Sequence, residues 1–141
     1  GQDKAAVDTP RRAMGHLLGN AVRIALADQT LVLGEGIETM LSVREAAPSL
    51  PVWAALSSGH LGAVLLPDGL QRLYIAIDRD PAGQRAAERL TARATEAGIA
   101  VMVLEPQLGD FNDDLRAHGA EALRQHLAQQ IDLKDQHRLT I

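Results

Sequence analysis

Two carboxylates follow directly after an apolar segment near the middle of the chain. The apolar run 73–77 leads into Asp78 and Asp80, which are separated by a single residue, and Pro81 then opens a long amphipathic segment. This order predicts a buried parallel strand, an acidic turn and a helix. The turn would lie at the carboxyl end of the strand, where open α/β sheets bind their ligands. Two carboxylates fixed there form an oxygen-rich site suited to Mg²⁺ or Mn²⁺.

Two further acidic segments share this context. Glu35 ends the apolar run 31–34 and is followed by Gly36, and a third acidic segment contains Asp110 and Asp113. Small residues beside Glu35 allow the backbone to approach a ligand closely. Together with the central pair, these segments predict a metal-dependent enzyme that acts on phosphate esters.

Strand-like and helix-like segments alternate along the chain. We expect strands at 21–26, 31–34, 52–56, 73–77 and 99–104, the first of them at an edge, and helices at 36–47, 60–66, 81–97, 110–118 and 120–131. This alternation favours an α/β fold with a mostly parallel sheet and helices on both faces. Right-handed crossovers bring the loops after the strands to one edge. The fold itself would therefore gather the acidic segments and the loop 57–60.

Composition and length favour one folded domain. The chain has 141 residues and 46% hydrophobic residues, enough for a single core. We expect a lead-in over 1–19, a domain over 20–131 and a charged, frayed tail over 132–141. Because the sequence starts with Gly1 rather than Met, we expect one domain of a longer protein.

Charge and cysteine content exclude several classes of protein. The absence of cysteine excludes disulfides, a thiolate nucleophile and Cys-ligated zinc within this chain. No apolar run approaches the roughly 20 residues that span a bilayer, and no signal peptide is visible, so we expect a cytoplasmic protein without a membrane partner. The net charge of −4 argues against a broad electrostatic footprint for nucleic acid, although bound divalent cations would attract phosphate locally.

Each carboxylate also has a structural interpretation. Asp80 before Pro81 is a normal helix N-cap, and Asp110 with Asp113 can likewise begin a helix. Both interpretations stay open. Glu35 could interact with a helix dipole. Asp78 is harder to explain structurally, because an unpaired carboxylate at the end of a buried strand is costly and a like charge two residues on adds to the cost.

Several nearby residues are candidates for contact with phosphate or substrate. His60 either contacts phosphate or opens a helix, and the second role is the commoner one. Arg79 and Arg85 flank the acidic turn, and each could pair with a carboxylate or hold a substrate phosphate. Gly36 and Asp113 complete this set of candidates.

Three motifs in this order resemble the Toprim domain. The motifs are Gly34-Glu35-Gly36 after an apolar strand, Asp78-Arg79-Asp80-Pro81-Ala82-Gly83, and Gly109-Asp110-Phe111-Asn112-Asp113. The similarity is greatest to the primase-like branch of phage, plasmid and mobile-element proteins and covers about residues 20–118. It implies a compact, mostly parallel four-stranded sheet. It also implies that Glu35, Asp78 and Asp80 are catalytic and that these three and Asp110 hold metal. Asn112 stands where primases often carry another Asp, which puts the number of metals in doubt.

The resemblance implies a function in DNA replication. The domain would catalyse Mg²⁺-dependent nucleotidyl transfer for primer synthesis, with single-stranded DNA, nucleotides and the other domains of a longer primase or primase-helicase as partners. The alternatives are a metal-dependent nuclease or topoisomerase-type phosphotransferase and a non-catalytic module that binds DNA or protein. A topoisomerase also needs a tyrosine nucleophile, and Tyr74, inside an expected buried strand, is a poor candidate.

Overall fold

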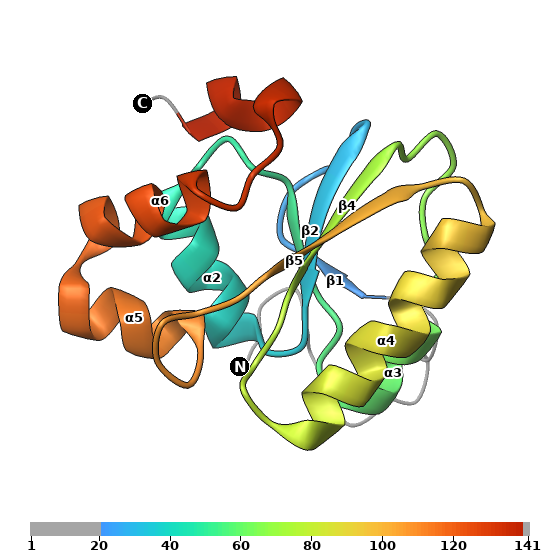
Figure 1. Cartoon of the computed structure of the whole chain (residues 1–141), viewed down its shortest axis with the longest axis horizontal. Coiled ribbons are helices and arrows are strands. Elements are labelled where there is room, and N and C mark those ends of the chain that lie inside the picture. The colour runs from blue at the N-terminus through green and yellow to red at the C-terminus, as the bar shows by residue number, and fades with distance from the viewer. Residues whose placement is uncertain (1–20, 140–141) are drawn as a thin grey trace.

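The computed structural model describes residues 21–139 (Figure 1). The expected lead-in over 1–19 lies outside the described residues. No helix in the described range is long and apolar enough to cross a membrane.

A five-stranded sheet forms the centre of the molecule, in the order β1-β3-β2-β4-β5. Its strands are β1 (Val22–Arg23), β2 (Thr30–Gly34), β3 (Val52–Ala54), β4 (Arg72–Ala76) and β5 (Ala100–Leu104). The pairs β2–β3, β2–β4 and β4–β5 are parallel. The expected four-stranded, mostly parallel sheet is therefore present. The predicted edge strand near residue 22 adds a short antiparallel fifth strand that pairs with β3.

Helices cover both faces of the sheet, as predicted (Figure 1). One face carries α2 (Ile37–Ala46), α5 (Phe111–His118) and α6 (Ala120–Ala128), and the other carries α3 (Ser58–Ala63) and α4 (Pro81–Glu96). Side chains of a strand point alternately to the two faces. In β4, Leu73 and Ile75 belong to the core under α3 and α4, whereas Tyr74 and Ala76 belong to the core under α2, α5 and α6.

Helix α3 begins and ends earlier than the predicted range 60–66. It begins at Ser58 because the Ser57 hydroxyl accepts a hydrogen bond from the backbone N–H of His60 at 3.1 Å, which caps the first turn. At its other end, the Arg93 guanidinium donates to the carbonyl oxygens of Gly62 and Val64, both at 2.7 Å. These bonds satisfy carbonyls that a further helical turn would otherwise use.

The chain after Ile131 is ordered, so the expectation of a frayed tail is wrong for the residues that the structure describes. A 3₁₀ helix, η1 (Leu133–Leu139), follows α6. Its Asp135 side chain is fully buried and accepts hydrogen bonds from Thr30 Oγ1 at 2.9 Å, Arg72 Nε at 2.7 Å and Tyr74 Oη at 2.6 Å. These contacts fasten the end of the chain to β2 and β4.

Removing the Asp135 carboxylate is expected to destabilise the fold strongly. Asp135→Ala leaves the buried Tyr74 hydroxyl and the Arg72 guanidinium without their partner, and breaking one side of a buried ion pair typically costs about 3–5 kcal/mol. The free energy of unfolding in urea at pH 7 measures this loss. Glu45→Ala, at an exposed position of α2, is the control and should change stability by less than about 0.5 kcal/mol.

The same contact predicts a dependence on pH. Burial alone would raise the pKa of Asp135, but the hydrogen bonds from Arg72, Tyr74 and Thr30 hold it well below its usual range. A carboxyl whose pKa is lower in the folded state stabilises the fold above its unfolded pKa of about 3.9, and this contribution is lost as the pH falls below that value. The stability gap between wild type and Asp135→Ala should therefore narrow in acid. A gap that stays constant down to pH 2.5 would contradict the assignment.

Candidate metal centre

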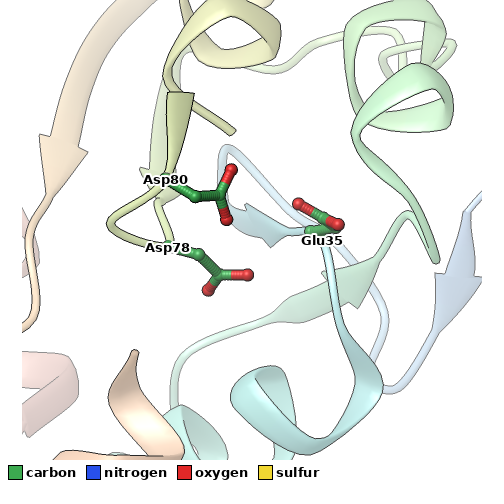
Figure 2. Close-up of side chains that lie close together, drawn as sticks. All are labelled: Glu35, Asp78 and Asp80. Atoms are coloured by element: carbon green, nitrogen blue, oxygen red, sulfur yellow. The ribbon is translucent and has the colours of Figure 1, made fainter. Parts of the chain in front are cut away.

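Two adjacent parallel strands deliver the central carboxylates to one point. Gly34 of β2 is in register with Ala76 of β4, so Glu35 and Asp78 leave the sheet at the same edge, and Asp80 follows in the turn before α4. One carboxylate oxygen from each of these three residues lies within 4.8 Å of the others. Figure 2 shows the three side chains around a common space. The predicted convergence of the central pair with Glu35 is confirmed.

The Asp78 carboxylate is the least satisfied polar group of this cluster. Its Oδ1 is buried and has no hydrogen-bond partner among the described residues. Burial, followed by the negative charges of Glu35, Asp110, Asp80 and Asp113, raises the pKa of Asp78 to about 6. An orphaned buried carboxylate oxygen among like charges is unfavourable unless a cation neutralises it. The donor set, which contains only carboxylate oxygens, fits Mg²⁺ or Mn²⁺.

Glu35 is held by its backbone while its side chain faces the cluster. The Glu35 carbonyl oxygen accepts a hydrogen bond from the N–H of Leu56 at 2.6 Å, which ties the loop after β2 to the loop after β3. Burial and the nearby charge of Asp80 raise the pKa of Glu35. A glutamate with a raised pKa is a better proton acceptor near neutral pH than an ordinary surface glutamate.

Asp80 and Asp110 both cap helices, which is one of the two roles that their positions in the sequence left open. Asp80 Oδ1 accepts from the N–H of Gly83 at 2.6 Å, and Asp110 Oδ1 accepts from the N–H of Asp113 at 2.7 Å. Each cap uses one carboxylate oxygen, so the other remains for a ligand. Asp110 lines the same cleft as Asp78 but does not belong to the group within 4.8 Å. Its role as a metal ligand stays a prediction.

A cleft of about 390 Å³ lies in front of Asp78. Its lining residues are Gly36, Ile37, Glu38, Thr39, Leu56, Asp78, Asp110 and Asn112. Gly36, a candidate for contact with phosphate or substrate, lines this cleft, and the contact itself stays a prediction. Sequence reasoning did not single out the apolar part of the wall, Ile37 and Leu56. The position of the loop after β3 followed from the topology, but the backbone of Leu56 (φ 84°) is left-handed, which no signal in the sequence indicates for a leucine.

The predicted phosphate contacts divide into two groups. His60 lies in the first turn of α3, with its Nδ1 2.6 Å from Ser57 Oγ, but the helix begins at Ser58, so the prediction that His60 opens the helix is wrong by two residues. Arg85 is exposed on α4, and Asp113 is exposed in the first turn of α5. Contact of these residues with phosphate remains a prediction.

Arg79 fastens a loop. Its guanidinium donates to the carbonyl oxygens of Pro106 (Nη2, 2.6 Å) and Leu108 (Nε, 3.1 Å), and its backbone N–H donates to Gly109 at 2.9 Å. These bonds join the acidic turn after β4 to the loop after β5. The guanidinium is therefore already engaged by the chain, which leaves it less available for a substrate phosphate.

Asp114 is an important residue that sequence reasoning missed. Only 2% of it is exposed, and its two oxygens accept from the N–H groups of Gln107 and Leu108, both at 2.8 Å. Asp114 thus binds the N–H groups of the loop before Asp110, and Arg79 binds carbonyl groups of the same loop. Its place next to Asp113 in an acidic run concealed this role, because such runs are usually solvated.

Comparison with known protein families identifies the family to which this chain belongs. Residues 30–121 match the family described as Toprim domain. The chain belongs to the Toprim family.

Solved structures similar to this Toprim domain come from primases. The primase fragment of the bacteriophage T7 primase-helicase protein matches with a TM-score of 0.58 and 19% identity, over 77% of this chain and 46% of that one. The Aquifex aeolicus primase, with its zinc-binding and RNA polymerase domains, matches with a TM-score of 0.51 and 23% identity, over 86% of this chain and 28% of that one.

A third match is in a T7 lagging-strand DNA polymerase complex with primase domains of two gp4 subunits bound to an RNA/DNA hybrid and dTTP. It has a TM-score of 0.50 and 24% identity, over 70% of this chain and 53% of that one. The Toprim domain therefore spans about half or less of each of these solved chains. No curated protein sequence matches it.

Neutralising Asp78 is expected to stabilise the metal-free Toprim domain. Because the pKa of Asp78 is about 6 in the folded state and about 3.9 in the unfolded state, protonation favours folding, and this stability is lost as the pH rises through 6. Asp78→Asn should raise the free energy of unfolding at pH 7.5 by about 1–3 kcal/mol in EDTA. The gain should shrink at pH 4.5. Urea unfolding measures both values, with Glu45→Gln as the neutral control. A loss of stability at pH 7.5 would mean that the chain itself satisfies Asp78.

Replacing Leu56 by glycine is expected to lower the stability of the fold less than replacing it by alanine. A left-handed backbone costs a non-glycine residue about 1–2 kcal/mol, whereas in ordinary structure Gly is less stable than Ala by about 0.5–1 kcal/mol. Leu56→Gly should therefore be more stable than Leu56→Ala. Leu65, an exposed loop leucine whose φ is not positive, should show the opposite order. Equal ranking at the two positions, measured by urea unfolding, would argue against strain at Leu56.

Proposed function

We propose that this Toprim domain is the catalytic domain of a primase-like protein and carries out metal-dependent nucleotidyl transfer for primer synthesis on single-stranded DNA. The observation that carries the proposal is the cluster of Glu35, Asp78 and Asp80 with its orphaned buried oxygen, beside a cleft large enough for a ligand. The similar solved chains are primases, and one was captured with an RNA/DNA hybrid and dTTP. These likenesses support the proposal through the fold.

The chemistry that the residues support is phosphoryl transfer. When bound, Mg²⁺ or Mn²⁺ would neutralise the nucleotide phosphates and stabilise the charge that develops during transfer. Asp78 and Asp80 would hold the ion, with the acidic segment at Asp110 adding negative charge on the α5 side of the cleft. Glu35 would either complete a metal position or accept the proton of the attacking hydroxyl, a role that its raised pKa favours.

The charge of the domain defines what it requires from partners. The net charge of −4 argues against a broad electrostatic footprint for nucleic acid, so most of the attraction for template DNA would come from other domains of a longer primase or primase-helicase. We place such a protein in the cytoplasm, in DNA replication of a phage, plasmid or mobile element. The metal cluster would then supply catalysis rather than affinity for the template.

Charge-neutral variants of the acidic turn test the activity. Asp80→Asn is well suited because asparagine caps a helix as well as aspartate does, so α4 should keep its start while the site loses a charge. Incorporation of labelled nucleotides on single-stranded DNA with Mg²⁺, assayed on the chain within its natural polypeptide, should fall by about 100-fold or more in Asp78→Asn and Asp80→Asn. Asp68→Asn, in the exposed turn before β4, should retain wild-type incorporation.

A Mg²⁺ titration separates binding from turnover. Backbone amide shifts that saturate at Glu35, Gly36 and residues 78–83 in wild type, and that are lost in Asp78→Asn, support the metal centre directly. Strand cleavage without incorporation would replace the proposal with a nuclease. Incorporation that survives both substitutions, or the absence of localised shifts, would leave a non-catalytic binding module.

A further inference from the structure

Strand β5 is an edge of the sheet in the part of the chain that the structure describes. It pairs only with β4, and in Figure 1 it crosses in front of β4 and β2 with no other ribbon before it. Ala100 N–H donates to Gln71 at 3.0 Å, and Leu104 C=O accepts from Ile77 at 3.1 Å. Because alternate residues of a strand bond to opposite sides, Val101 and Val103 direct their N–H and C=O groups away from β4.

Glu105 is the next residue after Val103 whose backbone groups point outward, and its N–H and C=O are already bonded to side chains of His126 in α6 and of Gln130 just after α6. Gln130 Oε1 accepts from the N–H of Glu105 at 2.8 Å, and Gln130 Nε2 donates to the Glu105 carbonyl at 3.0 Å. His126 Nε2 also lies 2.7 Å from that carbonyl. The Gln130 carboxamide thus takes the place that a peptide group of a neighbouring strand would occupy. Among residues 21–139, the open part of the edge is therefore confined to Val101 and Val103.

A groove of about 450 Å³ accompanies this open edge, between β5 and α4. Ile77, Ala87 and Val103 give it an apolar floor, and 40% of Val103 is exposed. The complete lining is Ile77, Gln84, Ala87, Glu88, Thr91, Ala92, Val103 and Glu105, which contains two carboxylates and no cationic residue.

The two carboxylates of the groove are weakly engaged. Glu88 forms no ion pair with the described residues, and Glu105 lies 3.8 Å from an Arg79 guanidinium that is also bound to the Pro106 carbonyl. Both side chains are exposed at the rim. A cation on a partner would therefore find negative charge that is only partly compensated, beside apolar surface.

We propose that this edge and groove bind an extended peptide segment by β-strand addition. The segment would hydrogen-bond to the outward peptide groups of Val101 and Val103. On the side facing α4 it would place an apolar residue against Val103 and, two positions along, a Lys or Arg near Glu88 and Glu105, because side chains two apart share one face of a strand. The surface lies beside α4 and β5, outside the carboxylate cluster, and its use does not depend on the proposed catalytic activity.

Peptide titrations followed by backbone NMR test the proposal. The probe is a capped eight-residue peptide with valine and lysine alternating on one face and threonine on the other; a matched peptide carries glutamate in place of lysine. The lysine peptide should shift the amides of Val101 and Val103 and slow their hydrogen exchange. The affinity of the glutamate peptide should be lower than that of the lysine peptide by at least about fivefold. Equal binding of the two peptides, or shifts confined to other surfaces, would overturn the proposal.

Substitutions at two positions, Val103 and Glu88, locate the contact. Val103→Pro removes an outward N–H without removing a hydrogen bond to β4, as tolerated on edge strands, and should abolish binding, whereas Val103→Thr keeps the N–H and should bind within about twofold of wild type. Glu88→Gln should weaken the lysine peptide about fivefold, and it tests the groove even if Val103→Pro perturbs folding. Light scattering of the free chain provides the last check: self-association that Val103→Pro abolishes would assign the edge to a second copy and overturn the proposal.

Discussion

Repulsion among Glu35, Asp78 and Asp80 is the constraint to which the rest of the site responds. Their oxygens lie within 4.8 Å of one another, and burial removes water from Asp78. Left to themselves, such side chains would move apart, because exposed carboxylates gain solvation and lose mutual repulsion. They stay together because each one leaves from the end of a strand or from the first turn of a helix, whose backbone is fixed by hydrogen bonds elsewhere. The fold therefore supplies the free energy that holds the like charges close.

The loops around the cleft show how this support is built. Arg79 binds the carbonyl groups of the loop after β5, and Asp114 binds the N–H groups of the same loop. On the other side, the Leu56 N–H holds the Glu35 carbonyl, although Leu56 must adopt a left-handed backbone to do so. Backbone strain of this kind persists only where surrounding contacts determine it. Four loops are thereby joined in two pairs before any ligand binds: the turn after β4 to the loop after β5, and the loop after β2 to the loop after β3.

The features that the sequence predicted depend on local patterns, whereas those that it missed depend mainly on contacts between residues far apart in the chain. Strand ends, the caps at Asp80 and Asp110 and the convergence of Glu35 with Asp78 follow from local patterns and from the handedness of crossovers. The roles of Asp114 and Asp135 were missed. Asp135 contacts Thr30 across 105 residues, and its charged surroundings in the sequence resemble a solvated tail. The strained φ of Leu56 likewise results from tertiary contacts, because leucine has no preference for that conformation.

The two buried acidic sites of this domain solve the same problem in opposite ways. At one end of the sheet, Asp135 receives hydrogen bonds from Thr30, Arg72 and Tyr74, and the chain itself satisfies the charge. This also removes Tyr74 as a nucleophile, because its hydroxyl is buried and bound. At the carboxyl end of the sheet, Asp78 receives no comparable partner from the described residues. The nearest arginine along the chain, Arg79, turns to backbone carbonyls instead. A fold that neutralises one buried carboxylate with its own side chains, and leaves another without a partner beside a cleft, favours a cation from outside the chain at the second position.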